Sequence, residues 1–328
     1  MVFRMHRVAA AIFAVTAAVL SGCATTPQTD RARASTRFGS ETSRVSGVPF
    51  FPQKAFQCGP ASLAEALSWS GVQVTPDQLS PEVYLPKRRG SLQAEMVAAV
   101  RRNARIAYVI RPGLPSLLQE LAAGNPVVIL ENLGLSWYPV WHYAVVVDIN
   151  VNADMITLRS GDFARQRMPL GLFERTWARS GYWGLLVLPP DRLPATAEER
   201  PYLKAVAAVE ALGHLRQARI AYHTALKRWP DSLAGQIGLG NTCYAMKDLR
   251  CAEAAYRVAA TRHPDSGIAY NNLAQTLADE GHLTRATAAA LRAVALGGPL
   301  APTFRKTLAG ITAHTGVVSR NDRRPDHR

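Results

Sequence analysis

A spacing of 34 residues recurs through the second half of the chain. Five kinds of position repeat at this step: Ala218, Ala252 and Ala286; Leu215, Leu249 and Leu283; Tyr222 and Tyr256; Ala225 and Ala259; Pro230 and Pro264. A fixed period of this length indicates stacked pairs of helices, because each pair buries its apolar face only against its neighbours. The second half of the chain is therefore expected to be entirely helical.

These units resemble tetratricopeptide repeats, in which small alanines permit close helix crossing and aromatic side chains fill the gaps between helices. The third unit has Ala290 where the first two have tyrosine, and residues 301–313 are expected to form a closing helix. Three units with a cap suffice to bury a continuous core, and their concave groove suits an extended peptide or a partner protein. A plain helical bundle that only packs on the first domain is the alternative.

The N-terminus has the pattern of an export signal. Arg4 and Arg7 precede an apolar run over residues 8–20, which leads into Ser21-Gly22-Cys23. The run is too short to span a membrane comfortably and ends in small residues. It resembles a bacterial lipoprotein signal, which implies that Cys23 becomes the acylated first residue of the mature chain. An ordinary cleaved signal with an incidental cysteine is the alternative.

The lipoprotein resemblance implies a cell-envelope protein that is lipid-anchored and faces the periplasm. Ala24 follows the cysteine, which favours the outer membrane by resemblance to enterobacterial lipoproteins. The formal charge of +14 is spread through both halves, and the chain has no interleaved aromatics or docking motif of a nucleic-acid interface. We therefore expect no nucleic-acid partner, and attraction instead to anionic lipid or to envelope polymers.

The remaining three cysteines differ in their surroundings. Cys243 and Cys251 lie on either side of a predicted turn between two antiparallel helices, within reach of each other. A disulfide and two buried thiols are both compatible with that spacing. Cys58 has no partner, and an unpaired thiol in an oxidising compartment needs another explanation.

Cys58 stands at the start of a predicted amphipathic helix. Gly59 and Pro60 follow it, and apolar residues recur at helical spacing from Ala61 to Leu67. At a helix N-terminus the dipole favours a thiolate, and free backbone N–H groups can stabilise an oxyanion. The sequence thus predicts a nucleophile with a depressed pKa, and Gln53 as a second oxyanion donor.

A base for this thiol is predicted at the mouth of a strand. His142 begins an almost uninterrupted run of β-branched and aromatic residues that ends at Asp148. A histidine in such a position can be merely structural. Its presence in the same domain as Cys58 favours a general base instead.

Gln53, the run Cys58-Gly59-Pro60-Ala61 and the run His142-Tyr143-Ala144-Val145-Val146 together resemble the bacteriocin-processing, or double-glycine-leader, cysteine peptidase family. This family is a branch of the papain-like fold, and the resemblance covers residues 45–188. It implies an α+β domain with a helical first lobe and a mostly antiparallel sheet. It also implies an oxyanion-hole glutamine, a nucleophilic cysteine and a general-base histidine, with no metal and no cofactor.

The third catalytic position departs from the family. Members usually carry Asp-Pro after the strand that follows the histidine strand, whereas this chain has Ser160-Gly161-Asp162. A hairpin that turns near Val151 and Asn152 places Gly161 roughly opposite His142, because antiparallel partners have a constant index sum. Either Ser160 or Asp162 is therefore a candidate to orient the imidazole.

The predicted organisation has six segments. These are a lipoprotein signal peptide (1–22), a flexible tether (23–44), a papain-like cysteine peptidase-like domain (45–188), a linker (189–201), tetratricopeptide repeats with a capping helix (202–314) and a basic disordered tail (315–328).

The leading hypothesis for function is an envelope-anchored cysteine peptidase whose repeats bind a protein partner or the peptide substrate. The rival hypothesis is a non-catalytic peptide-recognition or assembly lipoprotein with a degenerate peptidase fold, which the missing Asp-Pro favours. Acyl or amide transfer by the same dyad is a third hypothesis, because these reactions diverge only after the acyl-enzyme forms.

Overall fold

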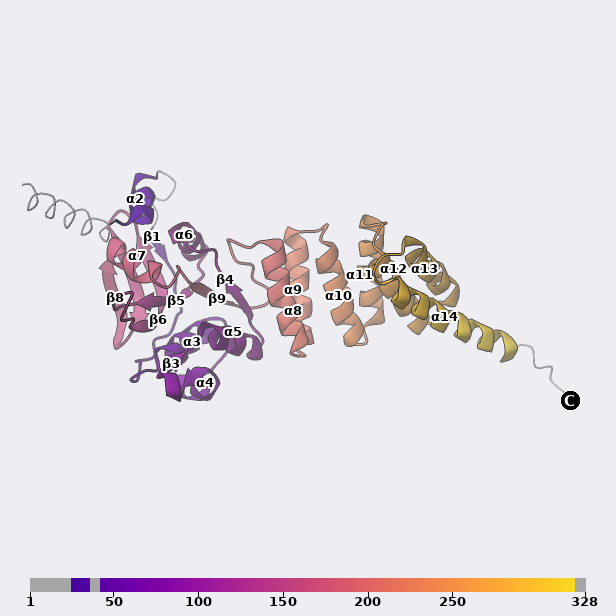
Figure 1. Ribbon diagram of the computed structural model, residues 1–328, viewed down its shortest axis with the longest axis horizontal. Helices are drawn as coiled ribbons and strands as arrows, with labels where there is room; N and C mark the ends of the chain where they lie inside the picture. Colours follow the sequence, from indigo (N-terminus) through magenta and orange to yellow (C-terminus); the bar gives the residue numbers. More distant parts are fainter. Residues whose placement is uncertain (1–24, 36–41, 322–328) are drawn as a thin grey trace, which may run out of the picture. The chain divides into compact units, whose positions relative to one another are not determined.

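The computed structural model describes residues 25–35 and 42–321, and the chain divides into two compact units (Figure 1). The first unit takes the chain up to Met96 and then Val109–Leu186, and the second takes Val97–Tyr108 and everything from Val187 onward. The predicted signal peptide, Cys23 and the last residues of the predicted tail lie outside the described residues. The predicted boundaries at residues 188 and 202 stay predictions.

A seven-stranded sheet organises the N-terminal half of the chain. Its strands are β1 (Thr42–Arg44), β4 (Ile106–Val109), β5 (Val127–Asn132), β6 (Trp141–Asn150), β7 (Met155–Ser160), β8 (Phe163–Pro169) and β9 (Gly184–Leu188). They lie in the order β4-β9-β5-β6-β7-β8, and β1 pairs with β6. The predicted strand that begins at His142 is present as β6, and β7 is the strand that was expected to follow it, whereas β1, β4 and β8 were not predicted.

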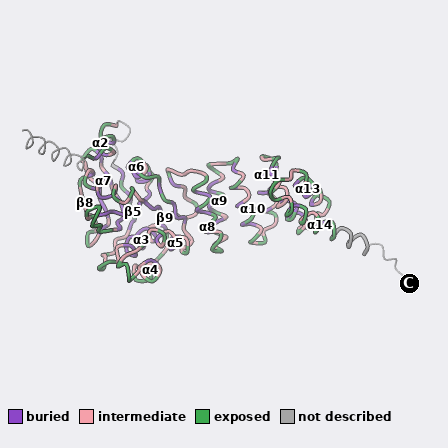
Figure 2. Tube along the Cα trace, in the orientation of Figure 1, coloured by how far each residue is buried: buried purple, intermediate pink, exposed green. Residues whose placement is uncertain are grey.

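Strands β5 and β6 form the buried centre of this sheet. All of β5 is buried, and so are the consecutive residues Tyr143–Val147 of β6. Side chains alternate between the two faces of a strand, so an unbroken buried run means that both faces are covered. Helix α3 (Cys58–Trp69) packs on β5 and β6, and α7 (Leu170–Ala178) packs on β5, β7 and β8. Figure 2 shows this burial along β5.

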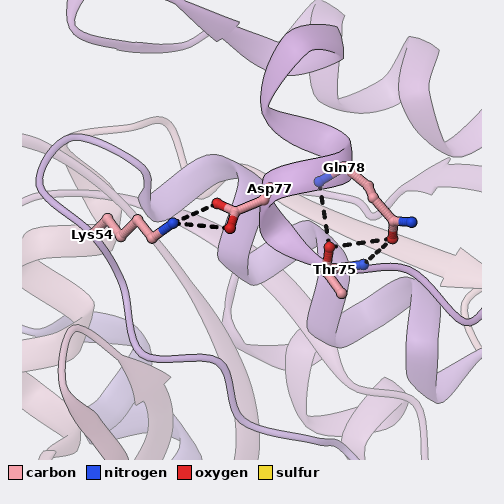
Figure 3. Close-up of polar contacts among 4 residues, drawn as sticks. All are labelled: Lys54, Thr75, Asp77 and Gln78. Carbon is pink, nitrogen blue, oxygen red and sulfur yellow. Dashed lines mark hydrogen bonds and ion pairs between the residues drawn. The ribbon is translucent and has the colours of Figure 1, made fainter.

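The other elements of the first half are short. They are α2 (Pro27–Ala34), α4 (Pro76–Val83), α5 (Gln93–Arg102), α6 (Leu114–Ala122), and a small hairpin of β2 (Tyr84–Leu85) and β3 (Gly90–Ser91) joined by the 3₁₀ turn η1 (Pro86–Arg88). Helix α4 begins at a capping box, in which the Gln78 N–H donates to Thr75 Oγ1 and the Thr75 N–H donates to Gln78 Oε1 (Figure 3). Such a cap satisfies backbone donors that a helix end leaves open.

The segment 23–44 is not a flexible tether where the structure describes it, so that prediction is wrong. The backbone N–H groups of Gln28 and Thr29, in the first turn of α2, donate to the two carboxylate oxygens of Glu174 at 3.0 and 2.7 Å. Strand β1 pairs with the far end of β6, with Ser43 opposite Ile149. Glu174 and β6 each lie more than a hundred residues away in sequence from the segment that they contact. The local composition of the segment therefore does not predict these contacts.

The C-terminal region is entirely helical, as the 34-residue period predicted. Its helices are α8 (Glu199–Ala211), α9 (Leu215–Arg228), α10 (Leu233–Ala245), α11 (Leu249–Arg262), α12 (Gly267–Asp279), α13 (Leu283–Leu296) and α14 (Ala301–Asn321). Consecutive helices pack on one another as antiparallel-repeat architectures require. The last helix continues past residue 314, where we expected a disordered tail to begin.

The repeated tyrosines fill gaps that glycines leave between helices. A methyl group on Gly240 of α10 would lie 2.3 Å from the ring of Tyr256 on α11, and one on Gly238 would lie 2.3 Å from the ring of Tyr222 on α9. The aromatic and the small residue are therefore complementary. A disulfide joins Cys243 in α10 to Cys251 in α11, and their α-carbons are 5.7 Å apart. This bond resolves the alternative that their spacing left open.

Substitution Gly240→Ala tests this packing. The added methyl overlaps the Tyr256 ring, and we expect it to lower the free energy of unfolding by about 1–3 kcal/mol in urea denaturation followed by circular dichroism. The matched control is Gly310→Ala in α14, where no atom lies within 4 Å of the new methyl. Because alanine favours a helix over glycine by up to about 1 kcal/mol, the control should be neutral or stabilising. Equal stability of the two variants would contradict the account.

Candidate active site

Cys58 is the first residue of α3 and is half-buried. Burial raises the pKa of its thiol, and the backbone N–H groups of Tyr143 and Gly59 oppose this effect by donating to the sulfur without reversing it. The prediction of a depressed pKa is therefore wrong in direction. The helix N-terminus was identified correctly, but the desolvation of the sulfur outweighs it.

Gly59 explains how the small hairpin reaches the first turn of α3. A methyl group on Gly59 would lie 2.3 Å from Ser91 Oγ and 2.6 Å from Ser91 Cβ, so only glycine permits this approach of β3. The hydroxyl of Tyr143, on β6, donates to the Ser91 carbonyl at 3.4 Å. The hairpin is thus held against the residue that follows the nucleophile.

Gln53 is tied to three elements around Cys58. Its backbone N–H donates to the Gly161 carbonyl at 3.1 Å, after the end of β7. Its side-chain Nε2 donates to the Tyr143 carbonyl at 3.4 Å and to Ser62 Oγ at 3.5 Å. Both side-chain contacts are at the long limit of a hydrogen bond, so the amide can turn one N–H towards a developing oxyanion.

His142 contacts Ser160, not Asp162. The distance from His142 Nε2 to Ser160 Oγ is 2.8 Å. Asp162 is exposed in the turn that follows Gly161, where the backbone has a φ of +59°. The structure therefore brings only Ser160 to the imidazole.

The observed hairpin register differs from the predicted one, which placed Gly161 opposite His142. Asn150 pairs with Met155, so the turn spans residues 151–154, and an irregularity between Val146 and Asp148 shifts the pairing before Val145 meets Arg159. The ladder ends before it reaches His142, and Gly161 is not its paired neighbour. A bulge of this kind adds one residue to one strand and cannot be read from the strand pattern.

Three of the predicted residues line one cavity of about 760 Å³, namely Gln53, Cys58 and His142. Ser160 joins them through its contact with His142, whereas Asp162 does not line the cavity. Burial lowers the pKa of His142. Together with the raised pKa of Cys58, this favours a neutral thiol and a neutral imidazole in the same cavity as the resting state.

Glu65 is a buried carboxyl group that sequence reasoning missed. It lies on α3, and its Oε1 accepts a hydrogen bond from the Phe51 N–H at 3.0 Å, which fixes the segment that leads to Gln53. Burial raises the pKa of Glu65 to about 8, and the nearby charge of Arg159 partly opposes this. The signal available in the sequence was a single charged residue within the mostly apolar run Ala61–Leu67.

The described residues contain no group of three or more His, Cys, Asp or Glu side chains that could hold a metal ion. The donors at the site suit acyl chemistry instead. A thiol, an imidazole with a positioned partner, and amide N–H groups directed at the sulfur are the elements of covalent catalysis by cysteine.

Comparison with known proteins agrees with the predicted resemblance over the first domain. Residues 45–184 match the model of the Peptidase_C39 like family. No curated protein matches the chain. The predicted fold class, an α+β domain of this papain-like type followed by an all-α repeat region, is confirmed by the family match and the observed elements.

Three solved structures show the range of similarity. A C39-like protein from Bacillus anthracis is 18% identical with a TM-score of 0.39, over 45% of this chain and 98% of that one. A double glycine motif protease of an AMS/PCAT transporter, bound to its leader peptide, is 19% identical with a TM-score of 0.35, over 44% and 96%. The tetratricopeptide-repeat protein YrrB is 19% identical with a TM-score of 0.33, over 38% and 63%. These distant likenesses assign no activity to this chain.

The contact between His142 and Ser160 predicts a ranking of two substitutions. Ser160→Ala removes the hydrogen bond that orients the imidazole, so we expect alkylation of Cys58 by iodoacetamide at pH 7 to slow about tenfold, the worth of one such bond. Asp162→Asn should change the rate less than about twofold, since the side chain is exposed and away from the cavity. Mass spectrometry of Cys58 over time gives both rates. The opposite ranking would assign the orienting role to Asp162.

Proposed function

We propose that this protein is a cysteine peptidase of the cell envelope, with Cys58 as nucleophile and His142 as general base. Gln53 and the backbone N–H of Cys58 bind the oxyanion, and Ser160 is a positioning residue. The observation that carries the proposal is the single cavity that Gln53, Cys58 and His142 share, with His142 Nε2 held 2.8 Å from Ser160 Oγ. The match of residues 45–184 to the Peptidase_C39 like family supports it.

The proposed acylation step uses Cys58 as the nucleophile and His142 as the base. Because Nε2 of His142 contacts Ser160, Nδ1 is the nitrogen left for the thiol. His142 Nδ1 takes the proton from Cys58 Sγ as the sulfur bonds to the peptide carbonyl carbon, and the amide N–H groups stabilise the negative oxygen. The C–N bond then breaks, and the imidazolium returns the proton to the leaving amine. This step leaves a thioester on Cys58 and a neutral imidazole.

Deacylation uses the same groups in reverse. His142 takes a proton from water, which attacks the thioester carbonyl, and the sulfur leaves as the oxyanion collapses to a carboxylic acid. The imidazolium then protonates the sulfur. For Nδ1 to act as the base, the hydrogen of the neutral imidazole must be on Nε2. The Nε2–H group then donates a hydrogen bond to Ser160 Oγ.

One observation favours the rival function, a peptide-recognition or assembly protein. The partner of His142 is a neutral hydroxyl, whereas a carboxylate would stabilise the imidazolium by a charge-assisted hydrogen bond about twice as strong. Burial also opposes ionisation of both Cys58 and His142. We weigh the enzyme higher because proton transfer between two neutral groups needs no resting ion pair.

The remaining parts of the chain complete the proposal. The repeat helices α8–α13 bind the peptide substrate or a protein partner, for which their stacked architecture is suited. The sequence around Cys23 supports a lipid anchor at a membrane, with the outer membrane favoured by Ala24. Among the described residues, no helix is both long and apolar enough to cross a membrane.

The pH dependence of alkylation tests the assignment of the base. In a chain carrying Cys23→Ser, Cys58 is the one free thiol, since Cys243 and Cys251 are bridged. The pKa of His142 is lowered, so its base form predominates at neutral pH, and the iodoacetamide rate of the wild-type site should be nearly level from about pH 7 to 8.5. In His142→Ala only the ionised thiol reacts, and its raised pKa should make the rate rise about tenfold per pH unit.

At pH 7 we expect the two rates to differ by about 100-fold, the usual size of a general-base effect. His223→Ala is the matched control, because it removes an exposed histidine of α9, outside the cavity, and should leave the profile level. Identical steep profiles with and without His142 would contradict its role as the base of Cys58.

Metabolic labelling tests the anchor. A clickable palmitate should mark the wild-type chain in cells, and Cys23→Ser should remove the mark and release the protein from the membrane fraction, because one thiol carries the acyl chains. Cys58→Ser is the control and should stay labelled. A mark that persists on the Cys23→Ser variant would refute lipidation at Cys23.

A further inference from the structure

The catalytic cavity has a lining of one charge sign. Four cationic side chains line it and no aspartate or glutamate does: Lys54, Arg88, Arg89 and Arg179. A concave site with charges of one sign concentrates ligands of the opposite sign and raises their rate of arrival. The chemistry of this lining therefore bears on which peptides reach Cys58.

Two of the four cations already have partners. Lys54 Nζ forms an ion pair with Asp77, at 2.6 and 2.9 Å from its two carboxylate oxygens (Figure 3). Arg179 donates to the backbone carbonyls of Asn132 and Gly134 at 2.9 and 2.8 Å. Both side chains therefore have partners within the protein already.

Arg88 and Arg89 are exposed, and neither forms an ion pair with a carboxylate in the part of the chain that the structure describes. The Arg89 guanidinium lies 5.6 Å from the centre of the Phe56 ring, a cation–π contact that leaves its N–H groups available. The two arginines stand at the tip of the β2–β3 hairpin, where Arg89 has a left-handed backbone with φ of +47°.

The hairpin holds these arginines beside the nucleophile. Ser91 of strand β3 lies against Gly59, the residue after Cys58. The Ser91 carbonyl also accepts a hydrogen bond from the hydroxyl of Tyr143. A planar guanidinium in a fixed position binds a carboxylate through two parallel hydrogen bonds. The hairpin therefore places two guanidinium groups on the lining of the cavity that contains Cys58.

A second feature lines the same cavity. The loop between β5 and β6 exposes Trp137 at 81% and Tyr138 at 69% of full exposure, and Trp141, the first residue of β6, is exposed at 50%. Tyr138 and Trp141 line the cavity. The loop is ordered, because Leu135 and Tyr138 exchange two backbone hydrogen bonds at 3.1 Å. An ordered, exposed aromatic surface marks an interaction site.

We propose that this site selects peptides in which an acidic residue is flanked by large apolar residues. Arg88 and Arg89 receive the carboxylate, and the aromatic side chains of Tyr138 and Trp141 receive the apolar side chains. The inference rests on the proposed function, since it names the substrate class of the same cavity.

An anionic membrane surface also attracts arginine and tryptophan. The peptide fits the observations better, because Arg88 and Arg89 line the cavity that contains Cys58 and are not spread over a face. Membrane binding is therefore treated as an outcome of the test.

The test compares two peptidyl vinyl sulfones, acetyl-Leu-Glu-Leu-Ala and acetyl-Leu-Lys-Leu-Ala, on the full chain with Cys23→Ser. We expect the glutamate probe to label Cys58 at least about tenfold faster at low ionic strength, and the advantage to shrink in 1 M salt, where the screening length falls to about 3 Å. Arg88→Gln with Arg89→Gln should bring the ratio close to one. Intact-mass spectrometry gives the rates.

The matched control is Arg216→Gln with Arg250→Gln, which removes the same charge from exposed positions in the repeats and should preserve the ratio. Tyr138→Ser with Trp141→Ser should slow both probes several-fold and leave their ratio unchanged. The iodoacetamide rate at Cys58 should stay the same in the Arg216→Gln with Arg250→Gln control, and in every variant the probe rates are divided by that rate.

Binding of the same two sequences, fluorescein-labelled, to Cys58→Ala gives a readout that needs no chemistry. If neither vinyl sulfone labels Cys58 but Cys58→Ala prefers the glutamate peptide through Arg88 and Arg89, the peptidase proposal fails and the recognition of acidic peptides stands. Labelling at equal rates would overturn the inference and leave the peptidase proposal in place.

Two further outcomes would also overturn the inference. One is the absence of any preference in both labelling and binding. The other is binding to phosphatidylglycerol vesicles that depends on Arg88 and Arg89 while the two peptides are not distinguished. That result would assign the surface to a membrane.

Discussion

The site depends on strand β6 and on the pairing that holds it in the centre of the sheet. β6 pairs with β5 along one edge and with β7 along the other, and β1 extends the pairing at its far end. Its first residues include His142 and Tyr143. Tyr143 makes three contacts at the site. Its carbonyl accepts from Gln53, its hydroxyl donates to the β2–β3 hairpin, and its backbone N–H donates to Cys58. A change in the β6 register would separate the nucleophile from its base.

Burial decides the electrostatics of this site more than the helix dipole does. The thiol of Cys58, the imidazole of His142 and the carboxyl of Glu65 all have pKa values shifted towards their neutral forms, and the first cause in each case is desolvation. Charge is concentrated instead at the cavity rim, on Arg88 and Arg89. A neutral interior under a cationic rim suits a reaction in which charge develops only as the substrate arrives.

The sequence predicted those features that local patterns carry. The 34-residue period predicted the repeat helices, the residues after Cys58 predicted the helix that it begins, and the run from His142 predicted a strand. Three features depended on distant partners or burial and were missed: the ordered segment with α2 and β1, the irregularity after Val146, and the direction of the Cys58 pKa. The choice between Ser160 and Asp162 depended on a side-chain contact that the sequence left open.

The central claim is that Cys58 carries an acyl group during turnover, and rapid-quench mass spectrometry with a peptide thioester tests it most directly. The account predicts a transient mass increase equal to the acyl group, located on the fragment that contains Cys58, which decays as the free peptide acid accumulates. The adduct should be absent in Cys58→Ala and should form far more slowly in His142→Ala. No adduct on Cys58, or one that forms at the same rate without His142, would contradict the claim.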